Sequence, residues 1–158
     1  MIDLSLNSGL LLIIVSASSL TLVACEQQIP LSLITIADAR NNPAKLIDNG
    51  EPGDSPGDIL LFDQPLLDKD MKTIGTNSGS CLRTRVGHSL QCQWTLTFGD
   101  EIKTSGSIQV AGREYDNGTS NISIVGGTGK YSGISGEMRS TNNSNGTFTQ
   151  VLHYKIGR

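Results

Sequence analysis

The most regular pattern in the chain is a strict alternation of apolar and polar residues between Leu90 and Phe98. Glutamine and threonine occupy the intervening positions, so every second side chain is apolar. Successive side chains of a strand point to opposite faces, and the pattern therefore predicts a half-buried antiparallel strand with one face toward a core. The apolar face consists of Leu90, Cys92, Trp94, Leu96 and Phe98.

Similar short runs, separated by turn residues, follow one another along the rest of the chain. We expect strands near residues 31–38, 58–66, 72–86, 89–98, 102–110, 120–125, 134–140 and 147–156. The stretch 41–57 is rich in Pro, Gly, Asn and Asp, which predicts a long loop or a short helical turn inside a loop. About eight strands with short connections predict an all-β domain, either a sandwich or an up-and-down barrel.

The N-terminus carries an uncharged apolar run over residues 9–24 that ends directly before Cys25. About a dozen apolar residues are too few to span a bilayer of about 30 Å, but they suit the core of a signal peptide. Small residues followed by a cysteine resemble a bacterial lipobox, in which Cys25 would be acylated. We therefore expect an export segment at 1–24, a tether at 25–30 and one domain at 31–158, in a cell-envelope lipoprotein. The first eight residues contain Asp3 and no Lys or Arg, so a secreted product cleaved near Cys25 or a misassigned start stays open.

The cysteine count fits this interpretation. If Cys25 carries the lipid, Cys81 and Cys92 remain as a pair, and disulfides persist outside the cell. Directly opposed residues in a hairpin bring their Cβ atoms within about 4.5–5.5 Å, which suits a disulfide and fixes the register. Arg83 and Arg85 then share the apolar face. An unpaired buried charge costs several kcal/mol, so we expect both arginines at a barrel mouth or beside an anion.

Composition and motifs exclude several function classes. A net charge of −3 with only 12 basic residues gives no nucleic-acid footprint. His88 and His153 lie far apart, and no Cys or His spacing resembles a zinc site. Lys130 follows a glycine-rich turn but lacks the Ser/Thr of a phosphate loop, and no Gly-x-Ser-x-Gly elbow occurs. We expect neither a metal nor a cofactor.

Three segments, 57–62, 74–81 and 125–137, occur in an order typical of one family, and the Gly-Gly-Thr-Gly-Lys-Tyr block in the third is the most specific. Together they resemble the allene oxide cyclase barrel superfamily, which includes plant allene oxide cyclases, dirigent proteins and small exported bacterial relatives. The spaced Cys81 and Cys92 hairpin is similar to the bacterial branch. The resemblance implies an eight-stranded antiparallel barrel whose apolar lumen shapes the coupling or cyclisation of a hydrophobic substrate. It also implies a homotrimer.

The resemblance transfers few catalytic groups. Thr35 and Ala37 stand where the plant cyclases place a glutamate and an asparagine, so we do not expect allene oxide cyclase activity. Cys81 stands where the cyclase cavity holds a cysteine, and here we expect it to have a disulfide partner. Asp38 is similar to a dirigent aspartate at the end of the first strand, although an aspartate before Asn-Asn-Pro is also a common turn former.

These observations favour an exported barrel that binds a hydrophobic small molecule and guides its coupling or cyclisation. The alternatives are a cyclase-type enzyme, with Asp38 or Arg83 stabilising charge, and a structural envelope lipoprotein whose barrel is filled by its own side chains. Arg83 would anchor a carboxylate or phenolate at the mouth. The expected ligand-binding residues are Arg83, Trp94, Leu96, Phe98 and Tyr154.

Overall fold

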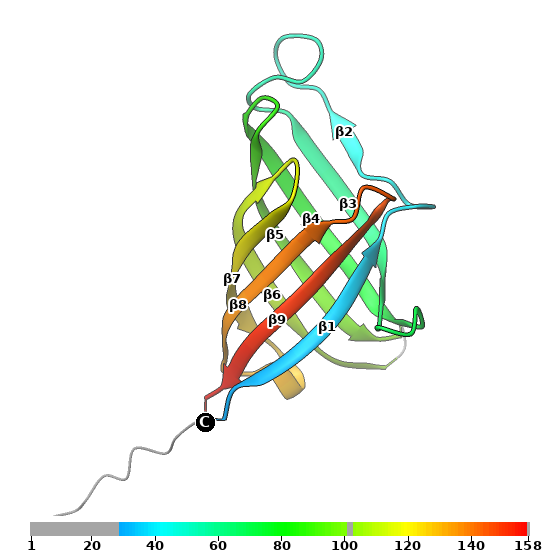
Figure 1. The fold of residues 1–158 in the computed structure, drawn as a ribbon, viewed down its shortest axis with the longest axis vertical. Coiled ribbons are helices and arrows are strands. Elements are labelled where there is room, and N and C mark those ends of the chain that lie inside the picture. The colour runs from blue at the N-terminus through cyan, green and yellow to red at the C-terminus, as the bar shows by residue number, and fades with distance from the viewer. Residues whose placement is uncertain (1–28, 101–102, 158) are drawn as a thin grey trace, which may run out of the picture.

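The computed structural model describes residues 29–100 and 103–157, and these form a closed antiparallel barrel (Figure 1). The predicted export segment, the predicted tether up to residue 28 and Cys25, the predicted site of lipidation, lie outside the described residues. The strands are β1 (Leu31–Asp38), β2 (Lys45–Ile47), β3 (Ile59–Leu67), β4 (Thr73–Arg85), β5 (Ser89–Gly99), β6 (Thr104–Tyr115), β7 (Thr119–Gly127), β8 (Ile134–Asn142) and β9 (Thr147–Ile156), with one 3₁₀ turn, η1 (Gly129–Tyr131).

The strands follow chain order around the barrel, and β1 closes it between β9 and β3. This confirms the predicted all-β, eight-stranded up-and-down barrel and excludes the sandwich. The chain shows no helix in its described part that is long and apolar enough to cross a membrane.

Two elements differ from the sequence-based expectation. The segment 41–57 contains the short strand β2, which pairs with Ile59–Leu61 of β3. Strand β1 meets β3 only at Leu66 and Leu67, so β2 covers backbone groups of β3 that would otherwise form an open edge. Strand β6 continues to Tyr115, five residues beyond the expected end at Val110.

The barrel has two different ends. One end, here called the loop end, carries the turns at 86–88, 116–118 and 143–146 together with the segment 39–58; it is uppermost in Figure 1. The opposite end carries η1 and both termini of the barrel.

The half near the opposite end is filled by side chains. Leu96, Ile108 and Leu152 are fully buried there. The ring centroids of Phe98 and Tyr131 lie 4.8 Å apart. Because Tyr131 is the buried residue of η1, this turn fills the end of the barrel with an aromatic side chain. Among the described residues, the lining of the large internal cavity comes from the loop-end half of the barrel.

Candidate functional site

A cavity of about 530 Å³ occupies the loop-end half of the barrel. This volume falls in the range of about 300–1,000 Å³ that is usual for small-molecule sites. Its wall is largely apolar and aromatic, with a few polar groups deeper in and at the mouth. The apolar lining includes Ala37, Leu60, Phe62, Leu90, Trp94 and Phe148, and the polar lining includes Gln64, Asn77, Arg83, Glu114, Asp116, Ser140 and Gln150.

A chain of buried hydrogen bonds crosses the barrel interior beside the cavity. The hydroxyl of Thr35 donates to Oε1 of Gln150 at 2.9 Å, and Nε2 of Gln150 donates to Oδ1 of Asn77 at 3.2 Å. These residues come from β1, β9 and β4. Thr35, which stands at the position matched to the cyclase glutamate, is thus engaged in a structural network.

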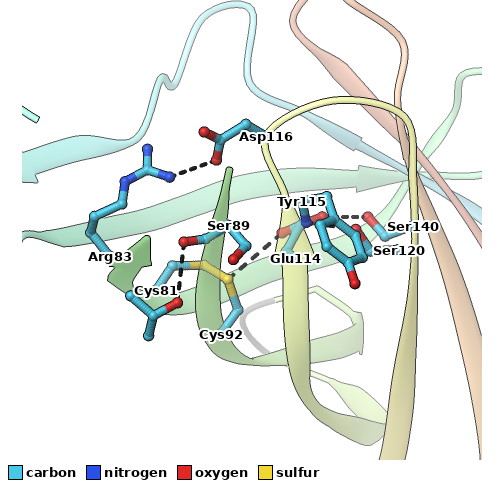
Figure 2. The surroundings of a disulfide bond; sticks show 10 residues. Cys81, Arg83, Ser89, Cys92, Glu114, Tyr115, Asp116, Ser120 and Ser140 are labelled. Carbon is cyan, nitrogen blue, oxygen red and sulfur yellow. Dashed lines mark hydrogen bonds and ion pairs between the residues drawn. A yellow bond between two sulfur atoms is a disulfide. The ribbon is translucent and has the colours of Figure 1, made fainter. Parts of the chain in front are cut away.

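Glu114 supplies a carboxyl group to the cavity wall, although the first strand offers none. Ser140 donates a hydrogen bond of 2.6 Å to its Oε1, while its Oε2 lies 3.8 Å from Sγ of Cys92 (Figure 2). Burial raises the pKa of Glu114 above its usual value, and the Ser140 hydroxyl only partly offsets this. A carboxyl group with a raised pKa retains its proton closer to neutral pH, as a general acid requires.

The predicted disulfide between Cys81 and Cys92 is present and joins β4 to β5 at directly opposed positions (Figure 2). The two sulfur atoms and the Glu114 carboxylate lie within 4.8 Å of one another. Because the sulfurs are bonded to each other, they do not offer the thiolates that bind metals. Their position instead gives Glu114 an uncharged, polarisable neighbour.

Arg83 lies at the mouth, and its guanidinium is held by two carboxylates of the protein. Nε contacts Oδ1 of Asp54 and Nη1 contacts Oδ1 of Asp116, each at 2.6 Å. Figure 2 shows the second of these contacts. The expectation that Arg83 sits at a barrel mouth or beside an anion is confirmed on both counts. These contacts, here called the Arg83 clamp, tie segment 39–58 and the β6–β7 turn to β4.

Segment 39–58 is itself ordered around a buried carboxylate. Asp58 is only 1% exposed and accepts backbone N–H groups of Ser55 at 2.7 Å and Asn49 at 2.9 Å. The backbone hydrogen bond from Ser55, followed by that from Asn49, lowers the pKa of Asp58. This places Asp54 in reach of Arg83.

Asp38 lies near the mouth but is paired locally. Nε and Nη2 of Arg40 contact its two carboxylate oxygens, each at 2.8 Å. The side-chain hydrogen bond from Arg40 lowers the pKa of Asp38. Its carboxylate therefore faces Arg40 and is not part of the cavity lining, which includes the neighbouring Ala37 and Ala39.

The five predicted ligand-binding residues separate into two groups. Arg83 and Trp94 line the cavity. Leu96, Phe98 and Tyr154 lie outside its lining: Leu96 is fully buried in the packed half, Phe98 packs on Tyr131, and Tyr154 faces the same ring at 6.4 Å. Contact of each of the five with a ligand stays a prediction.

Sequence reasoning missed Phe62, Phe148, Glu114 and Asp116. Phe148 shares a face with Gln150 and Leu152 in the alternation of the last strand, so the signal for it was present. Glu114 could be placed only with the full length of β6, because the run 111–115 contains no apolar alternation that would extend the strand. Phe62 meets Trp94 edge to face, with ring centroids 6.3 Å apart.

A model of the family described as Dirigent-like protein matches residues 32–157. The chain belongs to the dirigent-like family. This confirms the resemblance drawn from the three sequence segments. No curated protein matches the dirigent-like chain in sequence.

Solved structures with the same fold belong to proteins named for different activities. A pyocyanin demethylase matches with a TM-score of 0.67 at 22% identity, covering 79% of this chain and 100% of its own. The pterocarpan synthase dirigent protein PsPTS1 matches with a TM-score of 0.63 at 19% identity, covering 84% and 97%. The Diels-Alderase AbmU from Streptomyces koyangensis matches with a TM-score of 0.59 at 17% identity, covering 84% and 72%. At these identities the likeness of the dirigent-like chain to the three is one of fold.

Proposed function

We propose that the chain binds a hydrophobic, aromatic small molecule in the loop-end cavity and guides its coupling or cyclisation. The observation that carries this proposal is a half-open barrel: a cavity of about 530 Å³ with aromatic walls lies above a solidly packed half. Membership of the dirigent-like family supports a small-molecule role, as does a fold shared with a pterocarpan synthase dirigent protein, a pyocyanin demethylase and a Diels-Alderase.

The carboxyl group of Glu114 favours a catalysed reaction in the cavity over ligand binding alone. In its protonated form it donates a hydrogen bond, or the proton itself, to an oxygen atom of the bound molecule. In its ionised form it stabilises positive charge that develops during ring closure. Trp94 and Phe62 provide flat surfaces that hold an aromatic ring in one orientation. This gives the cyclase-type enzyme a carboxyl group that the first strand does not supply.

The alternative of a structural lipoprotein requires a barrel filled by its own side chains. That requirement fits the half that contains Leu96, Phe98 and Tyr131, whereas the loop-end half contains the cavity. One variant distinguishes the binder hypothesis from the enzyme hypothesis. Glu114→Gln should abolish turnover of an identified substrate under the enzyme hypothesis and should shift only its affinity under the binder hypothesis.

Native mass spectrometry of the chain taken from its producing cell tests the proposed function. We expect a mass above that of the polypeptide which disappears on denaturation, and whose fragments identify an aromatic molecule. A polypeptide mass alone, together with no saturable binding of any aromatic probe, would reject the proposal. The same spectra report the oligomer, which we propose to be a homotrimer as the resemblance implies.

We further propose that the chain is exported and anchored by lipid at Cys25. A disulfide between Cys81 and Cys92 supports an oxidising compartment. Replacement Cys25→Ala should release the chain from the membrane fraction and remove the mass of the lipid. Recovery of this variant in the membrane fraction, with a mass that differs from that of the unmodified chain only by the replaced side chain, would refute lipidation.

A further inference from the structure

We propose that the loop-end cavity selects a planar aromatic ligand that carries positive charge and rejects anionic ones. This inference rests on the proposed function, since it assumes that the cavity takes an aromatic ligand. It is an alternative to the prediction that Arg83 anchors a carboxylate or phenolate of the ligand.

The first step is the charge around the mouth. Within the described part of the chain, Arg83 is the only Lys or Arg in the cavity lining, whereas Glu114 and Asp116 both belong to it. Asp54 adds a third carboxylate through its contact with Arg83. The nearby Asp38 and Arg40 neutralise each other. One guanidinium therefore stands among three carboxyl groups.

The second step is that the positive charge of Arg83 is already engaged. Its side chain is only 13% exposed, and its contacts with Asp54 and Asp116 are both 2.6 Å. An anionic ligand would have to displace one of these two carboxylates, which are held in place by the protein, or remain beside both of them. Like charges in a partly buried site repel each other strongly, so the mouth disfavours anions.

The third step concerns the favourable contacts that the cavity offers to a cationic ligand. Glu114 receives a hydrogen bond from the neutral Ser140 hydroxyl, and no described cationic side chain is recorded in contact with it. A half-buried carboxylate without a counter-charge is costly, and a ligand cation would supply that counter-charge. The rings of Phe62, Trp94 and Phe148 belong to the wall, and aromatic rings attract a cation through their quadrupole. Burial raises the pKa of Glu114 in the ligand-free chain, in keeping with an uncompensated carboxyl group.

The test uses three acridines that share one ring system. They are 10-methylacridinium, acridine at a pH where its ring nitrogen is unprotonated, and acridine-9-carboxylate. Trp94 is the single tryptophan of the chain and lines the cavity, so quenching of its fluorescence reports binding at this site. We expect the cation to bind at least about tenfold more tightly than the neutral ring, and the anion to show no saturable quenching.

Two variants identify the group responsible. Glu114→Gln should weaken the binding of 10-methylacridinium about tenfold and leave the affinity for neutral acridine unchanged. The matched control is Glu137→Gln, because Glu137 is exposed on β8 outside the cavity lining and the replacement removes the same charge. The control should retain the affinity of the unmodified chain for all three probes.

The outcomes separate the inference from the function beneath it. Equal binding of all three acridines, or tighter binding of the anion, would overturn charge selection while leaving an aromatic-binding cavity in place. Equal loss of cation affinity in the Glu114 and Glu137 variants would also overturn it. No saturable quenching by any of the three would overturn the proposed function, and this inference with it.

Discussion

The hydroxyl of Ser140 donates a hydrogen bond of 2.6 Å to Oε1 of Glu114 and joins β8 to β6 across the intervening strand β7. This contact fixes the carboxyl group against the disulfide and the cavity wall. Because the donor is neutral, it orients Glu114 without compensating its charge. Both the proposed chemistry and the preference for a cation follow from this arrangement.

The first prediction concerns stability and pH. The folded chain holds the proton of Glu114 above the pH at which an unfolded glutamate loses it, so ionisation of Glu114 destabilises the fold as pH rises through that interval. Glu114→Gln removes this cost. The variant should gain free energy of unfolding near neutral pH, and the gain should vanish below the ordinary glutamate pKa of about 4.3. Urea unfolding across pH measures it, and a gain that is independent of pH would contradict the assignment.

The disulfide should stabilise the barrel by restricting the unfolded chain. Replacing both Cys81 and Cys92 by Ser should lower the free energy of unfolding by about 2–4 kcal/mol. A reductant should destabilise the unmodified chain by a similar amount and leave the double variant unaffected. Equal sensitivity of both proteins to the reductant would show that the disulfide contributes nothing to stability.

The Arg83 clamp should hold segment 39–58 over the mouth. Arg83→Ala removes contacts to two carboxylates, and we expect faster amide hydrogen exchange at 48–57 and at 116–118 together with a loss of about 1–3 kcal/mol. The neighbouring Arg85→Ala is the control, since Arg85 is exposed at the end of β4. Indistinguishable exchange in the two variants would mean that the clamp does not order the segment.

Gly79 should be required by the packing of Trp94. A Cβ added there would lie 2.3 Å from Cβ of Trp94 and 2.4 Å from the carbonyl oxygen of Gln93, so Gly79→Ala should cost about 1–3 kcal/mol or more and shift the Trp94 emission. Gly126→Ala is the control, because nothing described lies within 4 Å of a Cβ at that position. Equal stability of the two variants would contradict this packing account.

The sequence predicted the barrel well because alternation reports burial directly. The runs near Leu90–Phe98 and at 147–156 correspond closely to β5 and β9, and the register of the β4–β5 hairpin follows from opposed Cys81 and Cys92. The three family segments supplied what alternation cannot, since they distinguished a barrel from a sandwich.

The site was less accessible to sequence reasoning for two physical reasons. Alternation shows that Trp94, Leu96 and Phe98 face inward, but it does not show where along the barrel the lumen is filled. That depends on Tyr131, which enters from η1. The partners of Arg83 come from positions 54 and 116, 29 and 33 residues away, and no local pattern pairs groups at such separations.

The most direct test of the central claim is a crystal structure of the chain soaked with 10-methylacridinium. We predict electron density for the ring in the loop-end cavity, in contact with Trp94 and beside the carboxyl group of Glu114. A cavity without density while the probe occupies the barrel exterior, or a lumen closed by rearranged side chains, would contradict the account.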